Sequence, residues 1–210
     1  MSSPPHPVLP DQRLFTGVAR LAARYEGRFA PETVQRLLAD SYALLAADAQ
    51  VHTYLVVLAE RLTAERLEAL AKIQGALGTD HPRVLFVCSH NAGRSQLAAA
   101  LLTHRAGGDV QVSSAGTEPT TVVDPHIVQA LTEVGADAGA AYPKPLTDEV
   151  VQAADIVITM GCGDACPIVP GRRYLDWPVT DPEGAPIAVV REIRDEIDAH
   201  ITELLTELGV

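Results

Sequence analysis

The spacing of apolar residues changes once along the chain, near residue 80. Before that point they recur every three or four positions, which is the period of an amphipathic helix. The pattern predicts helices over residues 11–25, 31–44, 51–62 and 64–77, with Pro31 in a first turn and Thr63 as an N-cap. We therefore expect a bundle of three or four short helices in this part of the chain.

After residue 82, short apolar runs alternate with helical stretches. The runs predict strands over residues 83–87, 110–114, 155–159 and 172–175, and the stretches predict helices over residues 94–106, 124–135, 147–153 and 187–208. This alternation is typical of a parallel sheet with crossover helices. We expect an α/β protein: an N-terminal three- or four-helix bundle, then a four-stranded parallel sheet with flanking helices. Residues 78–82 (GTDHP) indicate a linker, so the predicted domains are residues 1–80 and 81–210.

Composition and charge narrow the class of protein. Of 210 residues, 47% are hydrophobic, enough for buried cores. The net charge is -11, with 8 basic and 9 acidic residues before residue 81 and 8 and 18 after it, so we expect no nucleic-acid partner. There is no membrane-length apolar stretch and no basic-then-apolar N-terminus, so we expect a cytoplasmic protein. Three cysteines in such a protein favour reactive or metal-binding thiols over structural disulfides.

Cys88 follows the first predicted strand and begins a loop that ends with Arg94 and Ser95 at a helix start. Such a loop turns backbone N–H groups inward and the helix dipole adds positive potential, so it suits a tetrahedral oxyanion. Arg94 can bind two of the anion's oxygens, the same field favours a thiolate at Cys88, and Ser95 can donate a hydrogen bond to that sulfur. We expect the anion to be bound by Ser89, His90, Asn91, Ala92, Gly93 and Arg94. Asn91 tolerates the left-handed backbone that tight loops need.

Two later segments carry further candidates. Cys162 and Cys166 lie four positions apart after the third predicted strand. In a helical turn this spacing places the Cα atoms about 6 Å apart, within the range of a disulfide. Asp181 precedes a proline in a loop, where its carboxyl group could protonate an oxygen leaving the bound anion.

Residues 83–208, about three fifths of the chain, resemble the low-molecular-weight phosphatase fold in its thioredoxin-coupled arsenate reductase branch. The resemblance rests on VLFVCSHNAGRSQ, VSSAGTEP, YPKPLTDE, IVITMGCGDACP and DWPVTDPEG. It implies that Cys88 attacks arsenate, that Arg94 holds its oxygens and that Asp181 protonates the departing hydroxyl. It further implies that Cys162 attacks Cys88 with release of arsenite, and that Cys166 then attacks Cys162 to give a disulfide that thioredoxin reduces.

The chain departs from this family pattern in three places. Ala92 and Gly93 stand where some relatives have a second loop cysteine, and Ala99 stands where others have a glutamate that binds potassium. We therefore expect no metal, and no cofactor. The gap between Cys162 and Cys166 is shorter than in the best-known members. The helical first half resembles an extension carried by some arsenate reductases, and Lys144 is expected to be a solvated loop lysine.

Other functions remain open at this point. A low-molecular-weight protein tyrosine phosphatase, or another phosphomonoesterase, would use Cys88, Arg94 and Asp181 identically, but it has no use for Cys162 and Cys166. The residues after the acid, 183–186, also lack the aromatic groups that stack on a phenol. A zinc or redox-sensing module fits less well, because Cys88 stands apart from the pair. A helical half that only binds a partner, a low-molecular-weight thiol as reductant, and the oligomeric state also stay open.

Overall fold

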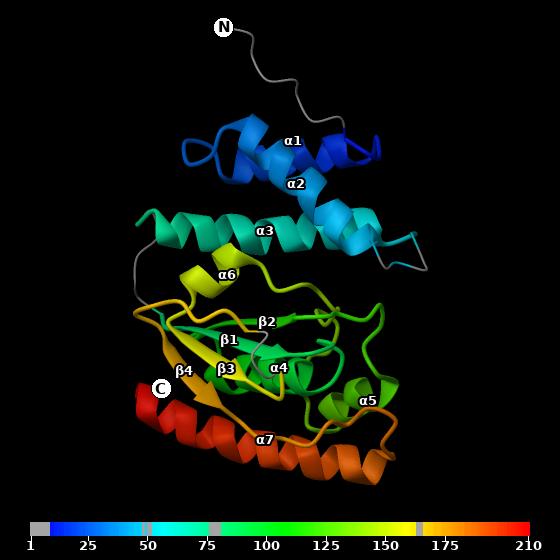
Figure 1. Cartoon of the computed structure of the whole chain (residues 1–210), viewed down its shortest axis with the longest axis vertical. Helices are drawn as coiled ribbons and strands as arrows, with labels where there is room; N and C mark the ends of the chain where they lie inside the picture. The colour runs from blue at the N-terminus through cyan, green and yellow to red at the C-terminus, as the bar shows by residue number, and fades with distance from the viewer. Residues whose placement is uncertain (1–8, 48, 50–51, 76–80, 163–165) are drawn as a thin grey trace, which may run out of the picture. The chain divides into compact units, whose positions relative to one another are not determined.

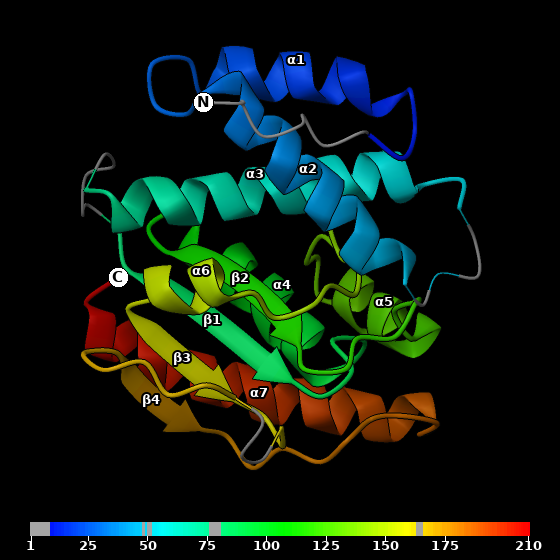
Figure 2. The same cartoon turned by 45° about the horizontal axis from the view of Figure 1, so that its top comes forward.

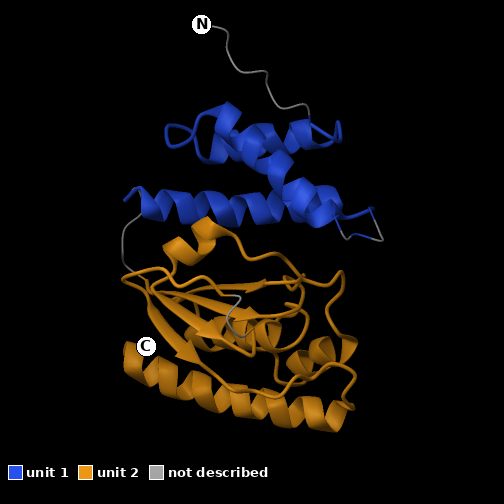
Figure 3. Cartoon of the chain, in the orientation of Figure 1, with its two compact units in different colours: residues 1–78 blue, residues 79–210 orange. Residues whose placement is uncertain are grey.

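The computed structural model describes residues 9–47, 49, 52–75, 81–162 and 166–210. The chain divides into two compact units, residues 1–78 and 79–210, which Figure 3 shows in separate colours. Residues 78–80 of the expected linker lie outside the described residues. Within the residues that are described, no helix has both the length and the apolar character needed to cross a membrane.

In its described part, the first unit is a bundle of three helices: α1 (Leu14–Arg24), α2 (Pro31–Ala46) and α3 (Leu55–Ile73). Pro31 opens α2, where its missing N–H costs no hydrogen bond. The prediction that Thr63 caps a separate helix is wrong. Thr63 lies inside α3 and its hydroxyl donates to the Ala59 carbonyl at 2.7 Å, so α3 runs on as one helix (Figure 2).

The second unit contains a four-stranded parallel sheet in the order β2-β1-β3-β4. Its strands are β1 (Arg83–Cys88), β2 (Gln111–Gly116), β3 (Ile156–Thr159) and β4 (Arg173–Asp176). Its helices are α4 (Arg94–Ala106), α5 (Pro125–Glu133), α6 (Asp148–Ala153) and α7 (Ile187–Leu208). Every predicted strand and helix of this unit is present, and the predicted α/β fold class is confirmed.

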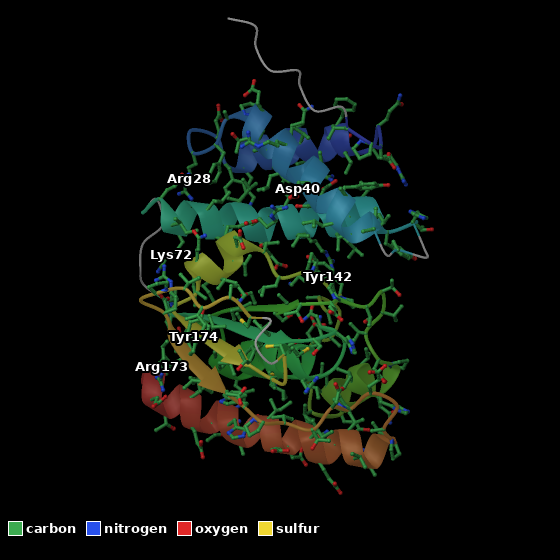
Figure 4. The ribbon with its side chains drawn as sticks, viewed as in Figure 1. Arg28, Asp40, Lys72, Tyr142, Arg173 and Tyr174 are labelled. Atoms are coloured by element: carbon green, nitrogen blue, oxygen red, sulfur yellow. The ribbon has the colours of Figure 1, made fainter. Side chains whose placement is uncertain are left out.

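Both faces of β1 are covered, which explains why its sequence is continuously apolar. Val84 and Phe86 pack in a cluster with α4, α5 and α7, whereas Leu85 and Val87 pack in a second cluster with Val151 of α6. Figure 1 shows α6 and α7 on opposite sides of the sheet. At the edge strand, Arg173, labelled in Figure 4, donates to the Glu207 carboxylate of α7 at 2.8 Å.

Parallel strands bring their carboxyl ends to one edge of the sheet, and ligands bind there in open α/β folds. Cys88 ends β1 and is paired in register with Gly116, the last residue of β2. Thr159, the last residue of β3, is paired with Val87. The loops that follow β1, β2 and β3 therefore meet around Cys88.

Candidate active site

The loop between β1 and α4 wraps around the sulfur of Cys88, which is 2% exposed. The backbone N–H of Asn91 donates to Cys88 Sγ at 3.2 Å, and Ser95 Oγ lies 2.9 Å from the same sulfur. Ser95 Oγ also accepts a hydrogen bond of 2.8 Å from Asn91 Nδ2, which leaves the hydroxyl proton free to point at sulfur. This arrangement is suited to a negatively charged sulfur.

The carbonyl groups of the loop accept hydrogen bonds from the segment that follows β2. Backbone N–H groups of residues 117, 118, 120 and 124 donate to the carbonyls of Cys88, Ser89, His90 and Ala92 at 2.9 to 3.2 Å. Because the carbonyls face outward, N–H groups of the loop are left for the inner side, at the start of α4. The loop thus offers backbone donors for an anion.

Arg94 is 7% exposed and lies at the first position of α4. Its Nη2 donates to Asp181 Oδ2 at 2.6 Å, so the predicted anion-binding group and the predicted acid are in direct contact. Its Nε is buried and has no hydrogen-bond partner among the described residues. A buried, unpartnered N–H of a guanidinium is a donor available to an anion.

Gly161, after β3, limits the space on the other side of Arg94. It has a φ of 73°, and a Cβ built there would lie 2.3 Å from Arg94 Nη1. Any larger residue at this position would displace the guanidinium. The sequence reasoning missed Gly161, although a glycine directly before Cys162 was visible in MGCG.

A pocket of about 260 Å³ opens over Cys88. Its walls are formed by loop residues including His90 and Arg94, by residues 120–125 and by residues 181–183. At the rim His90 Nδ1 lies 3.4 Å from Glu183 Oε2. Ligand atoms of His90, Asp181 and Glu183 lie within 4.8 Å of one another, but a cation bound there would compete with Arg94 for Asp181. The expectation of no metal stays a prediction.

A polar network holds Asn91 in place, and the sequence reasoning missed it. Asn91 is the one described non-glycine residue with positive φ, 48°. The buried Gln96 donates from Nε2 to the Asn91 carbonyl at 2.9 Å and to the Tyr142 carbonyl at 2.9 Å. Lys144 is not the solvated loop lysine that was expected, because it is only 9% exposed. Its backbone N–H donates to Asn91 Oδ1 at 3.0 Å, and its ammonium lies 4.8 Å from the Tyr142 ring centre.

Cys162 and Cys166 are free, buried thiols close to the end of β1. Cys162 Sγ lies 3.8 Å from the carbonyl oxygen of Val87, the residue before Cys88. Both pack in the cluster on the α6 side of the sheet, whereas Cys88 packs in the cluster on the other side. Residues 163–165 lie outside the described residues, so the expected helical turn between the two thiols is not tested.

The two thiols differ in their ionisation. A hydrogen bond from the Cys166 thiol, together with backbone N–H groups, lowers the pKa of Cys162 to about 7. The same bond, with burial, raises the pKa of Cys166. Cys162 is therefore the more acidic thiol of the pair.

Comparisons with known proteins cover both units. Residues 83–210 match the family of low molecular weight phosphotyrosine protein phosphatases, and residues 14–71 match the family described as protein-tyrosine-phosphatase-like, N-terminal domain. A putative arsenate reductase of Halobacterium salinarum is 32% identical over 59% of this chain and 91% of its own length. The solved structure of a thioredoxin-dependent arsenate reductase of Corynebacterium glutamicum has 45% identity and a TM-score of 0.86, covering 96% of this chain and 98% of its own.

A further solved structure is that of a phosphatase. The arginine phosphatase YwlE of Geobacillus stearothermophilus is 30% identical, with a TM-score of 0.54, over 61% of this chain and 93% of its own. The comparisons therefore include both a reductase that matches the two units and a phosphatase that matches about the second unit alone.

Proposed function

The chain belongs to the low molecular weight phosphotyrosine protein phosphatase family, and within it we propose that this protein reduces arsenate to arsenite with thioredoxin as the reductant. The observation that carries the proposal is the pair of buried thiols, Cys162 and Cys166, beside an oxyanion loop that already holds Cys88. Hydrolysis of a phosphate ester uses one sulfur. A reaction that removes two electrons from the protein uses two sulfurs, which form a disulfide. A third sulfur allows that disulfide to move away from the anion site.

The first step is attack by the Cys88 sulfur on arsenic. Arg94 and the inward N–H groups of the loop hold the arsenate oxygens and stabilise the charge that builds up on them. An S–As bond forms, one As–O bond breaks, and Asp181 supplies the proton with which that oxygen leaves as water. Arsenic is still pentavalent at this stage.

The second step transfers the electrons. The Cys162 thiolate attacks Cys88 Sγ, an S–S bond forms, and the electron pair of the S–As bond goes to arsenic, which leaves as trivalent arsenite. A pKa of about 7 makes Cys162 the nucleophile at neutral pH. Since Cys88 and Cys162 pack in different clusters, the segment that begins at Gly161 must rearrange for the two sulfurs to meet.

The third step moves the disulfide away from the anion site. Cys166 loses its proton and attacks Cys162, the Cys162–Cys166 bond forms, and Cys88 leaves as a thiolate ready for another anion. The dithiol of thioredoxin then reduces the new disulfide. The 45% identity to a thioredoxin-dependent enzyme over both units supports thioredoxin as the partner.

The second candidate is a phosphatase, favoured by the shared loop chemistry and by the arginine phosphatase among the similar structures. Phosphate and arsenate have the same shape and charge, so the loop alone does not separate them. We expect slow hydrolysis of small phosphate esters as a side activity, because Cys88, Arg94 and Asp181 suffice for it.

The test couples arsenate to oxidation of NADPH through thioredoxin reductase and thioredoxin. Wild-type protein should turn over, and Cys88→Ser, Cys162→Ser and Cys166→Ser should each abolish turnover. Hydrolysis of an aryl phosphate, measured in parallel, should be lost in Cys88→Ser alone. Wild-type rates of arsenate reduction in both relay variants would refute the roles given to Cys162 and Cys166. An absence of arsenate-dependent NADPH oxidation with wild-type protein would refute the proposed function.

A further inference from the structure

One hydroxyl group fixes the chain directly after Cys166. Tyr174 on β4, labelled in Figure 4, accepts a hydrogen bond of 2.9 Å from the backbone N–H of Val169. Its own O–H donates to the carbonyl of Pro167 at 2.8 Å. The Tyr174 hydroxyl thus binds one backbone N–H and one backbone carbonyl. It holds residues 167 and 169 against β4.

This contact decides which way the segment faces. Tyr174 and Val169 pack, partly buried, against the cluster that contains Cys162 and Cys166. Cys166 is 7% exposed. Ile168, which lies between the hydrogen-bonded residues Pro167 and Val169, is 83% exposed. Tyr174 thus holds the backbone on both sides of Ile168, and Cys162 and Cys166 pack in the same cluster.

The other end of the segment is fixed to the catalytic loop. Ser89 Oγ donates to the carbonyl of Gly161 at 3.2 Å, and Cys162 Sγ lies 3.8 Å from the carbonyl of Val87. The Cys162 end is thus attached near Cys88, and the Cys166 end is attached to β4. The two anchors are independent of each other.

We propose that Tyr174 is a positioning residue for the second thiol exchange. Its hydroxyl holds the backbone that follows Cys166, so that Cys166 reacts with Cys162 rather than with thiol-reactive molecules in solution. This inference rests on the proposed function, whose relay it deepens. In the exchange the Cys162–Cys166 bond forms, the Cys88–Cys162 bond breaks, and the electron pair of the broken bond stays on Cys88. The proton of Cys166 goes to water.

The physical basis is the local concentration of one thiol at another. A thiol held at the right distance reacts as if it were at very high concentration, and a loosened segment loses that advantage. Cys162 and Cys166 are both buried and pack in the same cluster, which is consistent with two sulfurs held together. A tyrosine hydroxyl with a purely structural role would stabilise β4 without changing the fate of one disulfide.

The test compares Tyr174→Phe, which keeps the ring and removes the hydroxyl, with wild type and with Tyr54→Phe. Tyr54 is 68% exposed in the first unit, so its variant controls for the same chemical change. Each protein is mixed with arsenate without thioredoxin, quenched with acid at successive times, and its disulfides are mapped by mass spectrometry. In a second measurement the reduced proteins are alkylated and the modification of Cys166 is followed.

In Tyr174→Phe we expect the Cys88–Cys162 disulfide to accumulate and its conversion to Cys162–Cys166 to slow roughly tenfold. We expect Cys166 to be alkylated roughly tenfold faster, because two hydrogen bonds no longer oppose local opening. Conversion at the wild-type rate in Tyr174→Phe would overturn the proposal. If arsenate oxidises no thiol even in wild type, the proposed function fails. In that case the alkylation rates of Cys166 test the positioning role by themselves. Equal rates in Tyr174→Phe and wild type would overturn it.

Discussion

Arg94 and Asp181 are joined by a hydrogen bond of 2.6 Å between Nη2 and Oδ2, across the mouth of the oxyanion loop. The proposed anion-binding group and the proposed acid are thus hydrogen-bonded to each other in the substrate-free protein. In the proposed mechanism, an entering anion takes over the guanidinium and releases Asp181 next to the oxygen that must leave. We therefore expect anion binding and proton transfer to be coupled through this one contact.

Asp181→Asn tests that coupling. The variant removes a negative charge from beside the anion and removes the proposed proton donor. It should therefore bind phosphate, which we expect to compete with arsenate, more tightly and turn over roughly 100-fold more slowly. The inhibition constant for phosphate and kcat for arsenate measure the two effects. Glu183→Gln, at the exposed rim, is the control for loss of one charge and should keep most of kcat. Weaker phosphate binding in Asp181→Asn would show that the carboxylate supports the anion site instead of competing for Arg94.

Gly161→Ala should disable the anion site without unfolding the protein. The new Cβ would lie 2.3 Å from Arg94 Nη1, and the φ of 73° adds about 1–2 kcal/mol of backbone strain. Gly171→Ala is a matched control, since its φ is 82° and its Cβ would meet no atom within 4 Å. Denaturant unfolding should show a similar loss of stability in both variants, and arsenate turnover should collapse only in Gly161→Ala. Equal activities would mean that Arg94 has room to move.

Gln96→Ala should weaken both the fold and the anion site. It removes the hydrogen bonds that Gln96 donates to the buried carbonyls of Asn91 and Tyr142, at a cost of about 2–3 kcal/mol. Gln129→Ala is the control, because the Gln129 side chain donates an exposed hydrogen bond to Glu133 and the loss of stability should fall within about 0.5 kcal/mol. Urea unfolding measures the stabilities, and phosphate binding reports on the loop. A Gln96→Ala protein as stable as the control would contradict the role given to this network.

The ionisation of Cys162 predicts a pH dependence. A lowered pKa means that the thiolate is populated above about pH 7 and is lost as pH falls through that value. The side chains acting on Cys162 are Cys166, which lowers its pKa, and Asp176, which raises it. Cys166→Ala removes the hydrogen-bond donor and should move the midpoint of Cys162 alkylation to higher pH. Cys166→Ser retains a donor and should move it less, so identical midpoints in the two variants would argue against this cause.

The elements of the second unit were predictable because its two central strands, β1 and β3, are buried on both faces. The run RVLFV has to be a central strand, and the residues that follow it have to form the loop at the carboxyl edge. The sequence also placed Cys88, Arg94 and Asp181 in segments that the structure brings together. These predictions depend on local pattern, which a single sequence carries.

What could not be predicted depends on contacts between distant segments. In the sequence, Gln96 is one polar residue of a predicted helix. Its hydrogen bond to the carbonyl of Tyr142, 46 positions away, appears only in the folded chain. Thr63 resembles a cap, but inside α3 its hydroxyl bonds one turn back. The hydroxyl of Tyr174 meets Pro167 and Val169 only because the chain turns back to form β4. Spacing along the sequence contains none of this information.

The most direct test of the account is a single turnover of the Cys166→Ser protein without thioredoxin. The variant keeps Cys88 and Cys162, so one equivalent of arsenate should yield one equivalent of arsenite and leave a Cys88–Cys162 disulfide, identified by acid quench, alkylation and peptide mass spectrometry. Release of arsenite with both cysteines still open to alkylation, or binding of arsenate with no arsenite formed, would contradict the proposed transfer of electrons from these two sulfurs.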